Sequence, residues 1–193
     1  MKTYDRSPTP TNPYPDRWKT LTNFRFGSAL SLIRPLNSVQ ERLGEDGNYI
    51  LQHDLLTEVE VDGERRAIQV PRGLITDLTS VPPLGRIFVS RVGPWLEAAL
   101  LHDYLYIAWQ DIPERGAREA DRRFADELFL VAMEHSEVAK WRRTLIFWSV
   151  RLFGGAPYRR RKTERFADLD DPALNGRLAF VMPSGRDQST RTA

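Results

Sequence analysis

The chain has 193 residues, 41% of them hydrophobic, and its formal net charge at pH 7 is +2. This length and hydrophobic content are enough for the buried core of one globular domain. The sequence contains no cysteine, which excludes disulfides, thiolate zinc sites and cysteine nucleophiles. A charge balance this close to neutral gives no strong signal for nucleic-acid binding.

The first segment, residues 1–19, is polar and contains Pro8, Pro10, Pro13 and Pro15. Closely spaced prolines favour extended or polyproline II conformations and leave few side chains for a core. We therefore predict an extended arm that is either free or lies along a partner. We expect no signal peptide and no transmembrane segment, because no run approaches the ~18 apolar residues that a membrane span needs.

Short alternating or β-branched runs follow the arm and indicate β-strands. The predicted strands are residues 28–33, 49–52, 56–61 and 66–70. Asp62 and Gly63 separate the last two strands, and both residues tolerate the positive φ of a two-residue turn. The sequence therefore predicts a β-hairpin at this point.

A motif loop at residues 76–86 separates the β-rich part from the helices. It begins with Thr76 and Asp77, followed by further hydroxyl residues and a rigid Pro-Pro pair. Hard cations such as calcium bind carboxylate and carbonyl oxygens, so Asp77 is a candidate metal ligand together with Asp103. The alternative is structural, with Asp77 capping a helix or turn.

Two helices are predicted at residues 96–109 and 117–133, joined by the short polar sequence DIPERG. The first contains no Gly or Pro and is apolar over much of its surface, so we expect it to be well buried. The second places Phe124 and Leu128 on one apolar stripe. The short connection predicts an antiparallel helix hairpin.

A third helix is predicted at residues 138–153. Its apolar residues recur every three to four positions, at Trp141, Leu145, Trp148 and Leu152. We expect this stripe to pack on the hairpin as part of the core. Gly154, Gly155 and Pro157 are predicted to end the helix.

Together these elements predict an α+β fold, in which a small antiparallel β-sheet from the N-terminal half packs with a C-terminal three-helix unit that contains the antiparallel helix hairpin. The domain is expected to span residues 20–165. It comprises a β-rich part at 20–76, the motif loop at 76–86 and the helices at 95–153. Residues 166–193 are polar and are predicted to form a C-terminal tail.

A polar cluster is predicted between the two helices of the hairpin. His102 and Tyr106 are four residues apart and share a helix face, whereas Asp103 points about 100° away. If the hairpin turns near residues 113 and 114, Asp121 lies roughly opposite Tyr106. A histidine that faces a carboxylate is suited to act as a general base. The alternative is a satisfied structural network of polar groups within the core.

The same residues resemble the catalytic helices of the phospholipase A2 family, in the patterns HDxxY from His102 and ADxxF around Asp121. This resemblance implies that His102 is the base that activates water and that Asp103 is a calcium ligand. It also implies that Asp121 orients the histidine and that Tyr106 supports this carboxylate. The sequence has no Gly-rich calcium loop of the usual kind, and Asp77 is the candidate substitute.

A wider pattern covers about residues 55–153. It consists of VPRG at 70–73, TDLTSVP at 76–82, LHDYLY at 101–106 and ADRRF at 120–124. These motifs resemble an uncharacterised domain family common in tailed phages and prophages. The resemblance implies a phage or mobile-element origin, and therefore a location in the phage virion or the host cytoplasm. It carries no established activity.

The leading hypothesis from the sequence is a phage-encoded, calcium-assisted ester hydrolase of phospholipase A2 type. The first alternative is a non-enzymatic component of the phage virion or tail, whose arm at 1–19 contacts other phage structural proteins. A peptidoglycan-degrading hydrolase is the second alternative. A lipid or membrane surface is a candidate partner, because the basic run at 159–162 could attract the phosphates of lipid or of nucleic acid; the alternative is a solvated run of charges.

Overall fold

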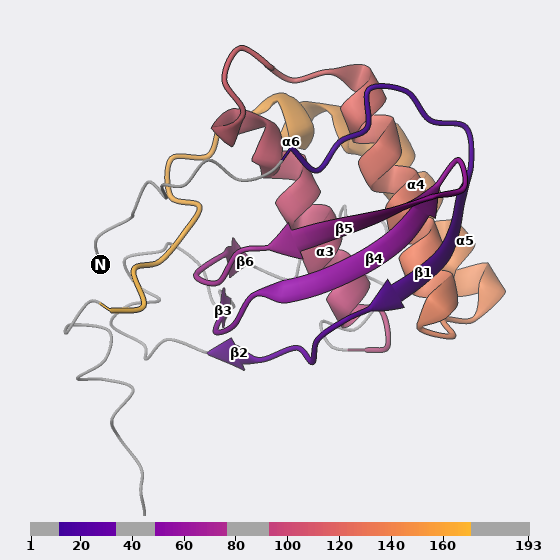
Figure 1. Ribbon diagram of the computed structural model, residues 1–193, viewed down its shortest axis with the longest axis horizontal. Coiled ribbons are helices and arrows are strands. Elements are labelled where there is room, and N and C mark those ends of the chain that lie inside the picture. Colours follow the sequence, from indigo (N-terminus) through magenta and orange to yellow (C-terminus); the bar gives the residue numbers. More distant parts are fainter. Residues whose placement is uncertain (1–11, 34–48, 77–92, 171–193) are drawn as a thin grey trace, which may run out of the picture.

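Strands occupy the N-terminal half of the chain and packed helices the C-terminal half, as the computed structural model shows for residues 12–33, 49–76 and 93–170 (Figure 1). The strands form small antiparallel sheets. This architecture is a mixed α+β fold and confirms the predicted fold class.

The helical half begins with α3 (Leu96–Ile107), which continues into the short 3-10 helix η1 (Ala108–Asp111). Helix α4 (Glu119–His135) and helix α5 (Lys140–Phe153) follow. Helix α5 ends at Gly154 as predicted, but the chain then forms a further short helix, α6 (Gly155–Arg159). Pro157 lies in the first turn of α6, where its missing N–H removes no intrahelical hydrogen bond.

The larger described sheet has the strand order β1-β4-β5 and is antiparallel. Strand β4 (Leu55–Val61) and strand β5 (Glu64–Val70) form the predicted hairpin. Asp62 and Gly63 connect them with φ angles of 53° and 87°, both in the left-handed region. The hairpin prediction is therefore confirmed, and so is the reason for it.

Strand β1 (Leu21–Phe26) was not predicted from the sequence. It pairs with β4, but the register shifts between Thr22 and Arg25, and Asn23 has a φ of 49°. This irregularity is a β-bulge, which interrupts the alternation of inward and outward side chains. The periodic pattern that indicates a strand is therefore lost at this point.

The second sheet is short and has the strand order β2-β3-β6. Its strands are β2 (Leu32–Ile33), β3 (Tyr49–Leu51) and β6 (Ile75–Thr76). Strand β2 covers only the last two residues of the predicted strand at 28–33. The rest of the predicted motif loop, from residue 77 to 86, lies outside the described residues.

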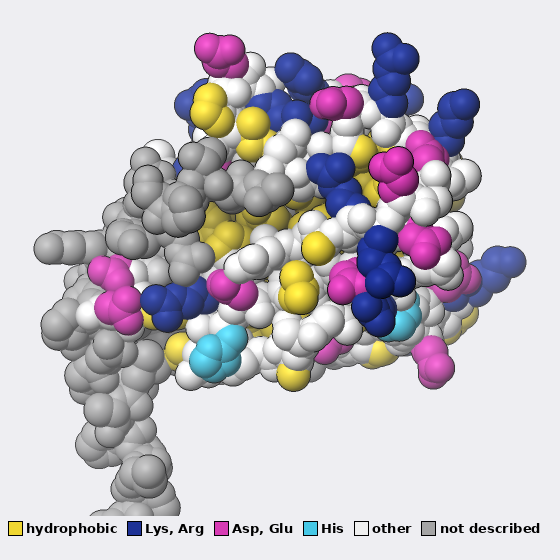
Figure 2. Space-filling model, in the orientation of Figure 1, with side chains coloured by type: hydrophobic (Ala, Val, Ile, Leu, Met, Phe, Trp, Pro, Cys, Tyr) yellow, Lys and Arg dark blue, Asp and Glu magenta, His cyan; other side chains and the backbone are white. Residues whose placement is uncertain are grey.

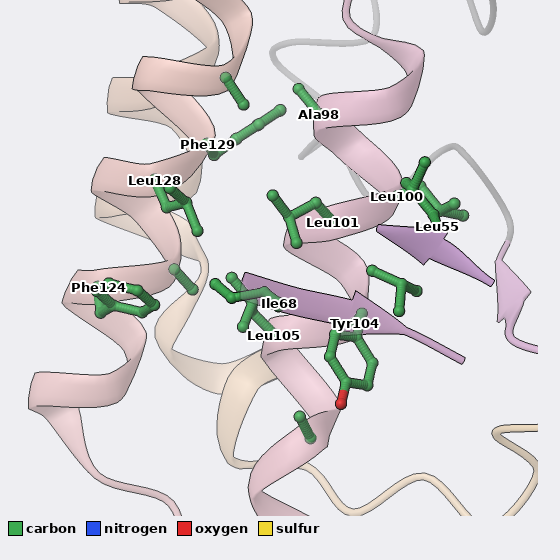
Figure 3. Packing of buried hydrophobic residues seen from close by; sticks show 14 of the residues in the cluster. Leu55, Ile68, Ala98, Leu100, Leu101, Tyr104, Leu105, Phe124, Leu128 and Phe129 are labelled. Atoms are coloured by element: carbon green, nitrogen blue, oxygen red, sulfur yellow. The ribbon is translucent and has the colours of Figure 1, made fainter. Parts of the chain in front are cut away.

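The core lies between the larger sheet and the helices (Figure 1). Helix α4 contacts both α3 and β1, and α5 packs on α4. Figure 3 shows the side chains of Leu101 and Leu105 from α3 in one cluster with Leu128 from α4 and Ile68 from β5. The helix hairpin is thus held against the sheet by apolar contacts.

The N-terminal boundary of the folded unit differs from the prediction, because the end of the expected arm packs on the core. Tyr14 is buried, its ring meets that of Phe124 edge to face, and its hydroxyl donates a hydrogen bond to the carbonyl oxygen of Leu105. Trp18 also packs against Phe124. The folded unit therefore includes residues that precede position 20.

The C-terminal boundary also differs from the predicted one at residue 165. Phe166 and Ala167 are buried, and Phe166 forms a β-bridge with Leu74. The amide of Ala167 donates a hydrogen bond to the carbonyl oxygen of Gly73 at 2.7 Å. These two residues therefore belong to the folded unit. The rest of the predicted tail, residues 171–193, lies outside the described residues.

Helix α5 is rotated relative to the prediction. Three residues of its expected core stripe face solvent, since Trp141, Trp148 and Leu152 are 59%, 53% and 68% exposed. Ile146 and Val150 are buried instead, on the opposite side of the helix. Within the described ranges, no helix is both long enough and apolar enough to cross a membrane.

Candidate functional site

His102 and Tyr106 lie one turn apart on α3 and face α4, as the sequence predicts. Their ring centroids are 4.1 Å apart. The ring of His102 also stacks on that of Phe129 from α4, with a centroid distance of 4.6 Å, and the residue is only 5% exposed. Packing on two sides therefore fixes the orientation of the imidazole.

The carboxylate that meets both residues is Asp126, and the prediction of Asp121 in this place is wrong. Oδ1 of Asp126 accepts a hydrogen bond from the Tyr106 hydroxyl at 2.7 Å and lies 3.1 Å from Nε2 of His102. Asp121 instead accepts two hydrogen bonds from the guanidinium of Arg115, at 2.7 and 2.8 Å.

The length of the connection between the helices explains this difference. Residue 102 pairs with 129 and residue 106 with 126, so the hairpin is centred near Gly116. The prediction placed the centre near residues 113 and 114, but the 3-10 helix η1 extends the chain before the turn. A shift of about two and a half residues in the centre moves the partner on α4 by five positions, from 121 to 126, which is somewhat more than one helical turn.

Asp126 is completely buried and is surrounded by hydrogen-bond donors. Its second oxygen, Oδ2, lies 3.1 Å from Nη1 of Arg122 and 3.3 Å from Nη1 of Arg151. Burial raises the pKa of Asp126, but the hydrogen bond and charge of His102, together with Tyr106 and Arg122, lower it by more. The net shift is downward, so this carboxylate is ionised at neutral pH.

Tyr106 serves the site as a neutral donor. Burial raises the pKa of its phenol well above the ordinary value, and the neighbouring charge of Asp126 raises it further. The hydroxyl therefore keeps its proton and donates a hydrogen bond to Asp126. Gly154 makes room for this contact, because a Cβ at that position would overlap the Tyr106 hydroxyl oxygen.

The ionised state of Asp126 also determines which nitrogen of His102 carries the proton. An ionised carboxylate only accepts hydrogen bonds, so Nε2 of a neutral His102 is the protonated nitrogen and Nδ1 carries the lone pair. In the described part of the chain, Nδ1 has no hydrogen-bond partner. The ring is therefore oriented by its carboxylate on one side and can accept a proton on the other.

The expected calcium ligands are only partly described. Asp103 is half-buried, and its Oδ2 accepts a hydrogen bond from the hydroxyl of Thr76 at the end of β6, at 2.6 Å. Asp77 lies outside the described residues. Among residues 12–33, 49–76 and 93–170, no group of three or more His, Cys, Asp or Glu side chains is placed to hold a metal ion. The described residues alone therefore do not form the expected cation site.

Sequence reasoning missed Asp126 and its two arginines. One local signal could have identified the ion pair between Arg122 and Asp126, because these residues are four positions apart, which is the spacing of an ion pair on a helix. A second signal was the position of Asp126 directly after the buried Phe124 and Ala125, where a carboxylate requires partners. The contribution of Arg151 depends on how α5 packs on α4, which no local pattern specifies.

No curated protein and no solved structure matches the chain. A family model described as "Protein of unknown function (DUF1353)" matches residues 53–150, which is just over half of the chain. The matched region begins before β4 and contains all of α3 and α4, and thus His102, Tyr106 and Asp126. The chain therefore belongs to the DUF1353 family, a family of proteins of unknown function.

Proposed function

We propose that the chain is a phage-encoded hydrolase of phospholipase A2 type, in which His102 is the general base for attack of water on a lipid ester. One observation carries this proposal. Nε2 of His102 lies 3.1 Å from the buried, ionised carboxylate of Asp126, while Nδ1 has no partner among the described residues. Asp126 takes the orienting role that the sequence suggested for Asp121.

In the proposed reaction, a water molecule gives a proton to Nδ1 of His102 as its oxygen attacks the ester carbonyl carbon. The imidazolium that forms is stabilised by Asp126, which Tyr106 and Arg122 hold in place. The tetrahedral intermediate then expels the alcohol, which receives the proton from His102. The products are a fatty acid and a lysolipid, and the base is regenerated.

A calcium ion bound by Asp103 remains part of this proposal only because the resemblance to phospholipase A2 suggests it. The described residues supply one carboxylate there, beside the hydroxyl of Thr76. We therefore assign no step of the reaction to a metal. Adding a chelator such as EDTA to the assay described below measures directly whether turnover needs a divalent cation.

A second candidate is a non-enzymatic role in the phage virion or tail. It is favoured by the two arginines that contact Asp126, because Arg122 pairs with this carboxylate within α4 and Arg151 connects it to α5. Such a buried ion-pair network can serve structure alone. In this case His102 is one more donor to a structural carboxylate, and the chain has no turnover.

The test is release of fatty acid from phospholipid vesicles by the purified full chain, with and without calcium. His102→Gln retains a side-chain amide that can donate to Asp126 but cannot act as a base. We expect it to lose a factor of about 10²–10⁴ in turnover. The matched control is His53→Ala, since His53 is exposed and lies apart from the α3–α4 site. This control is expected to keep full activity.

Circular dichroism and urea unfolding establish that each variant is folded. A folded His102→Gln protein with full activity would overturn the mechanism. Absence of turnover by the wild-type chain under all cation conditions would favour the structural role. Release of soluble peptidoglycan fragments instead of fatty acid would show that the substrate is peptidoglycan, the other class that the sequence suggested, with His102 as the candidate base.

A further inference from the structure

The positive charge of the chain is concentrated in one segment, residues 138–163, which we call the basic-aromatic segment. Eight of the 28 Lys and Arg residues of the chain lie in it, and none of the 26 Asp and Glu residues does. The segment therefore carries +8, while the rest of the chain carries a net charge of −6. It consists of α5, α6 and the residues that flank them.

The exposed apolar side chains are concentrated in the same segment. Among the described residues, the large hydrophobic side chains that are exposed are Leu56 on β4 and four on α5, namely Trp141, Trp148, Leu152 and Phe153. Trp141, Trp148 and Leu152 fall within an arc of about 40° on a helical projection. Two tryptophans and a leucine thus form one outward stripe along α5.

Exposed cationic side chains lie at the start of α5 and beyond its end. Lys140 is exposed at the start of α5, and the guanidinium of Arg142 lies over the ring of Trp141, 5.1 Å from its centroid. Beyond the other end of α5, all four residues of the run 159–162 are exposed. In the described part of the chain, neither Lys140 nor any residue of this run forms a salt bridge.

The face that carries the larger sheet has a different character. Figure 2 shows Lys and Arg side chains next to Asp and Glu side chains on that face. Arg25 and Glu58 on β1 and β4 form one such pair, at 2.6 Å. Charges that alternate in sign have no net attraction for a charged surface, so the sheet face offers no comparable site.

We propose that the basic-aromatic segment binds to the surface of membranes that contain anionic lipids, with α5 lying in the plane of the interface. Tryptophan and leucine side chains favour the boundary between headgroups and acyl chains, and lysine and arginine are attracted to anionic headgroups. The segment provides the apolar stripe on α5, an exposed lysine at the start of that helix and four exposed cations beyond its end. This proposal does not depend on the catalytic role of His102.

Other occupants fit the surface less well. Arg143 and Arg151 pair with acidic residues of α4, but a second copy of the chain that used the same face would still bring together two sets of the exposed cations Lys140 and 159–162, which opposes association. Single-stranded RNA would pair with the cations and could stack bases on the two tryptophans, but it would leave Leu152, which is 68% exposed, in water. A lipid surface with anionic headgroups is complementary to the charge and to the apolar stripe together.

The test is sedimentation of the full chain with vesicles of phosphatidylcholine alone or of phosphatidylcholine and phosphatidylglycerol in equal amounts. We expect the chain to bind the mixed vesicles at least about tenfold more tightly, and binding to weaken as salt increases. The variant Trp141→Ser/Trp148→Ser should lose at least about tenfold in affinity, because both side chains are exposed and contribute to the interface. Leu56→Ser is the matched control and should bind like the wild type.

The charge contribution is tested separately with Arg160→Gln/Arg161→Gln, which should bind the mixed vesicles more weakly and depend less on salt. Its matched control is Arg17→Gln/Lys19→Gln, which removes two exposed charges from another part of the chain. Equal binding to both kinds of vesicle, or unchanged binding by the tryptophan variant, would overturn the proposal. So would a dimer in solution that the tryptophan variant dissociates. Because the readout is binding, failure of the hydrolase proposal leaves this result unaffected.

Discussion

Replacing Asp126 by Asn tests the central feature of the candidate site. This feature is a buried carboxylate that accepts hydrogen bonds from side chains of three helices. The amide has nearly the same size but no charge, so Arg122 and Arg151 lose the countercharge that lies 3.1 and 3.3 Å away. Breaking a buried ion pair by removing one partner costs about 3–5 kcal/mol. Arg122 keeps a second partner in Glu119, at 2.6 Å. We therefore expect a loss near the lower end, about 3 kcal/mol in the free energy of unfolding.

The assay is equilibrium unfolding in urea at pH 7, followed by far-UV circular dichroism. The matched control is Glu127→Gln, one residue farther along α4, where the carboxylate is partly exposed and 3.7 Å from Arg151. An ion pair of this kind contributes about 0.5 kcal/mol or less. A loss below about 1 kcal/mol for Asp126→Asn would refute the reasoning, since the buried Arg122 and the partly buried Arg151 cannot both lose this countercharge at so small a cost.

The pH dependence of the same comparison follows from the lowered pKa of Asp126 in the folded chain. Its stabilising contribution is present above the unfolded pKa of about 3.9 and is lost as the pH falls through the lower folded value. The stability difference between wild type and Asp126→Asn should thus shrink as the pH falls below about 4 in urea titrations, and a difference that grows from about pH 4 to about pH 2 would contradict this. A second comparison concerns Gly154, where an added Cβ would overlap the Tyr106 hydroxyl oxygen. Gly154→Ala should lose about 1–3 kcal/mol in urea unfolding, whereas Gly155→Ala, whose nearest neighbour is the flexible Arg159 guanidinium at 3.3 Å, should change by less than about 1 kcal/mol. Equal losses in the two variants would exclude a special role for Gly154.

The parts of the fold that the sequence predicted correctly are those set by local interactions. The turn at Asp62 and Gly63 depends on backbone conformations that few residue types adopt, and both residues have the expected positive φ. The shared face of His102 and Tyr106 follows from helical geometry alone. The missed strand β1 shows the limit, because the bulge at Asn23 disrupts the local pattern itself.

The candidate site was predicted only in part because its carboxylate comes from another element. Identifying Asp126 rather than Asp121 requires the length of the connection between α3 and α4. The single 3-10 helix before the turn is enough to change which carboxylate of α4 meets His102. The roles of Arg151 and Gly154 depend in addition on the packing of α5. Such information is tertiary, and the spacing of residues within one helix does not contain it.

Helix α5 shows why an apolar stripe does not by itself identify a core face. Ile146 and Val150 recur at the same helical spacing as Trp148 and Leu152, so the sequence contains two apolar stripes. The stripe with the larger side chains was predicted to face the core. The structure buries the smaller stripe and exposes the larger one. An exposed stripe of large side chains requires a physical reason, and the basic residues around it suggest an anionic lipid surface as that reason.

Arg151 connects the proposed hydrolase site with the proposed membrane-binding surface. It projects from α5 toward Asp126, whereas Trp148 and Leu152 of the same helix face solvent. The helix proposed to lie on the membrane thus also contributes Arg151 to the candidate site, and membrane binding would hold that site close to the lipid ester proposed as its substrate. The two roles can still be separated, because Trp148 does not contact Asp126 or His102. A tryptophan variant that loses vesicle binding but keeps the stability of the Asp126 network would establish that the two faces of α5 act independently.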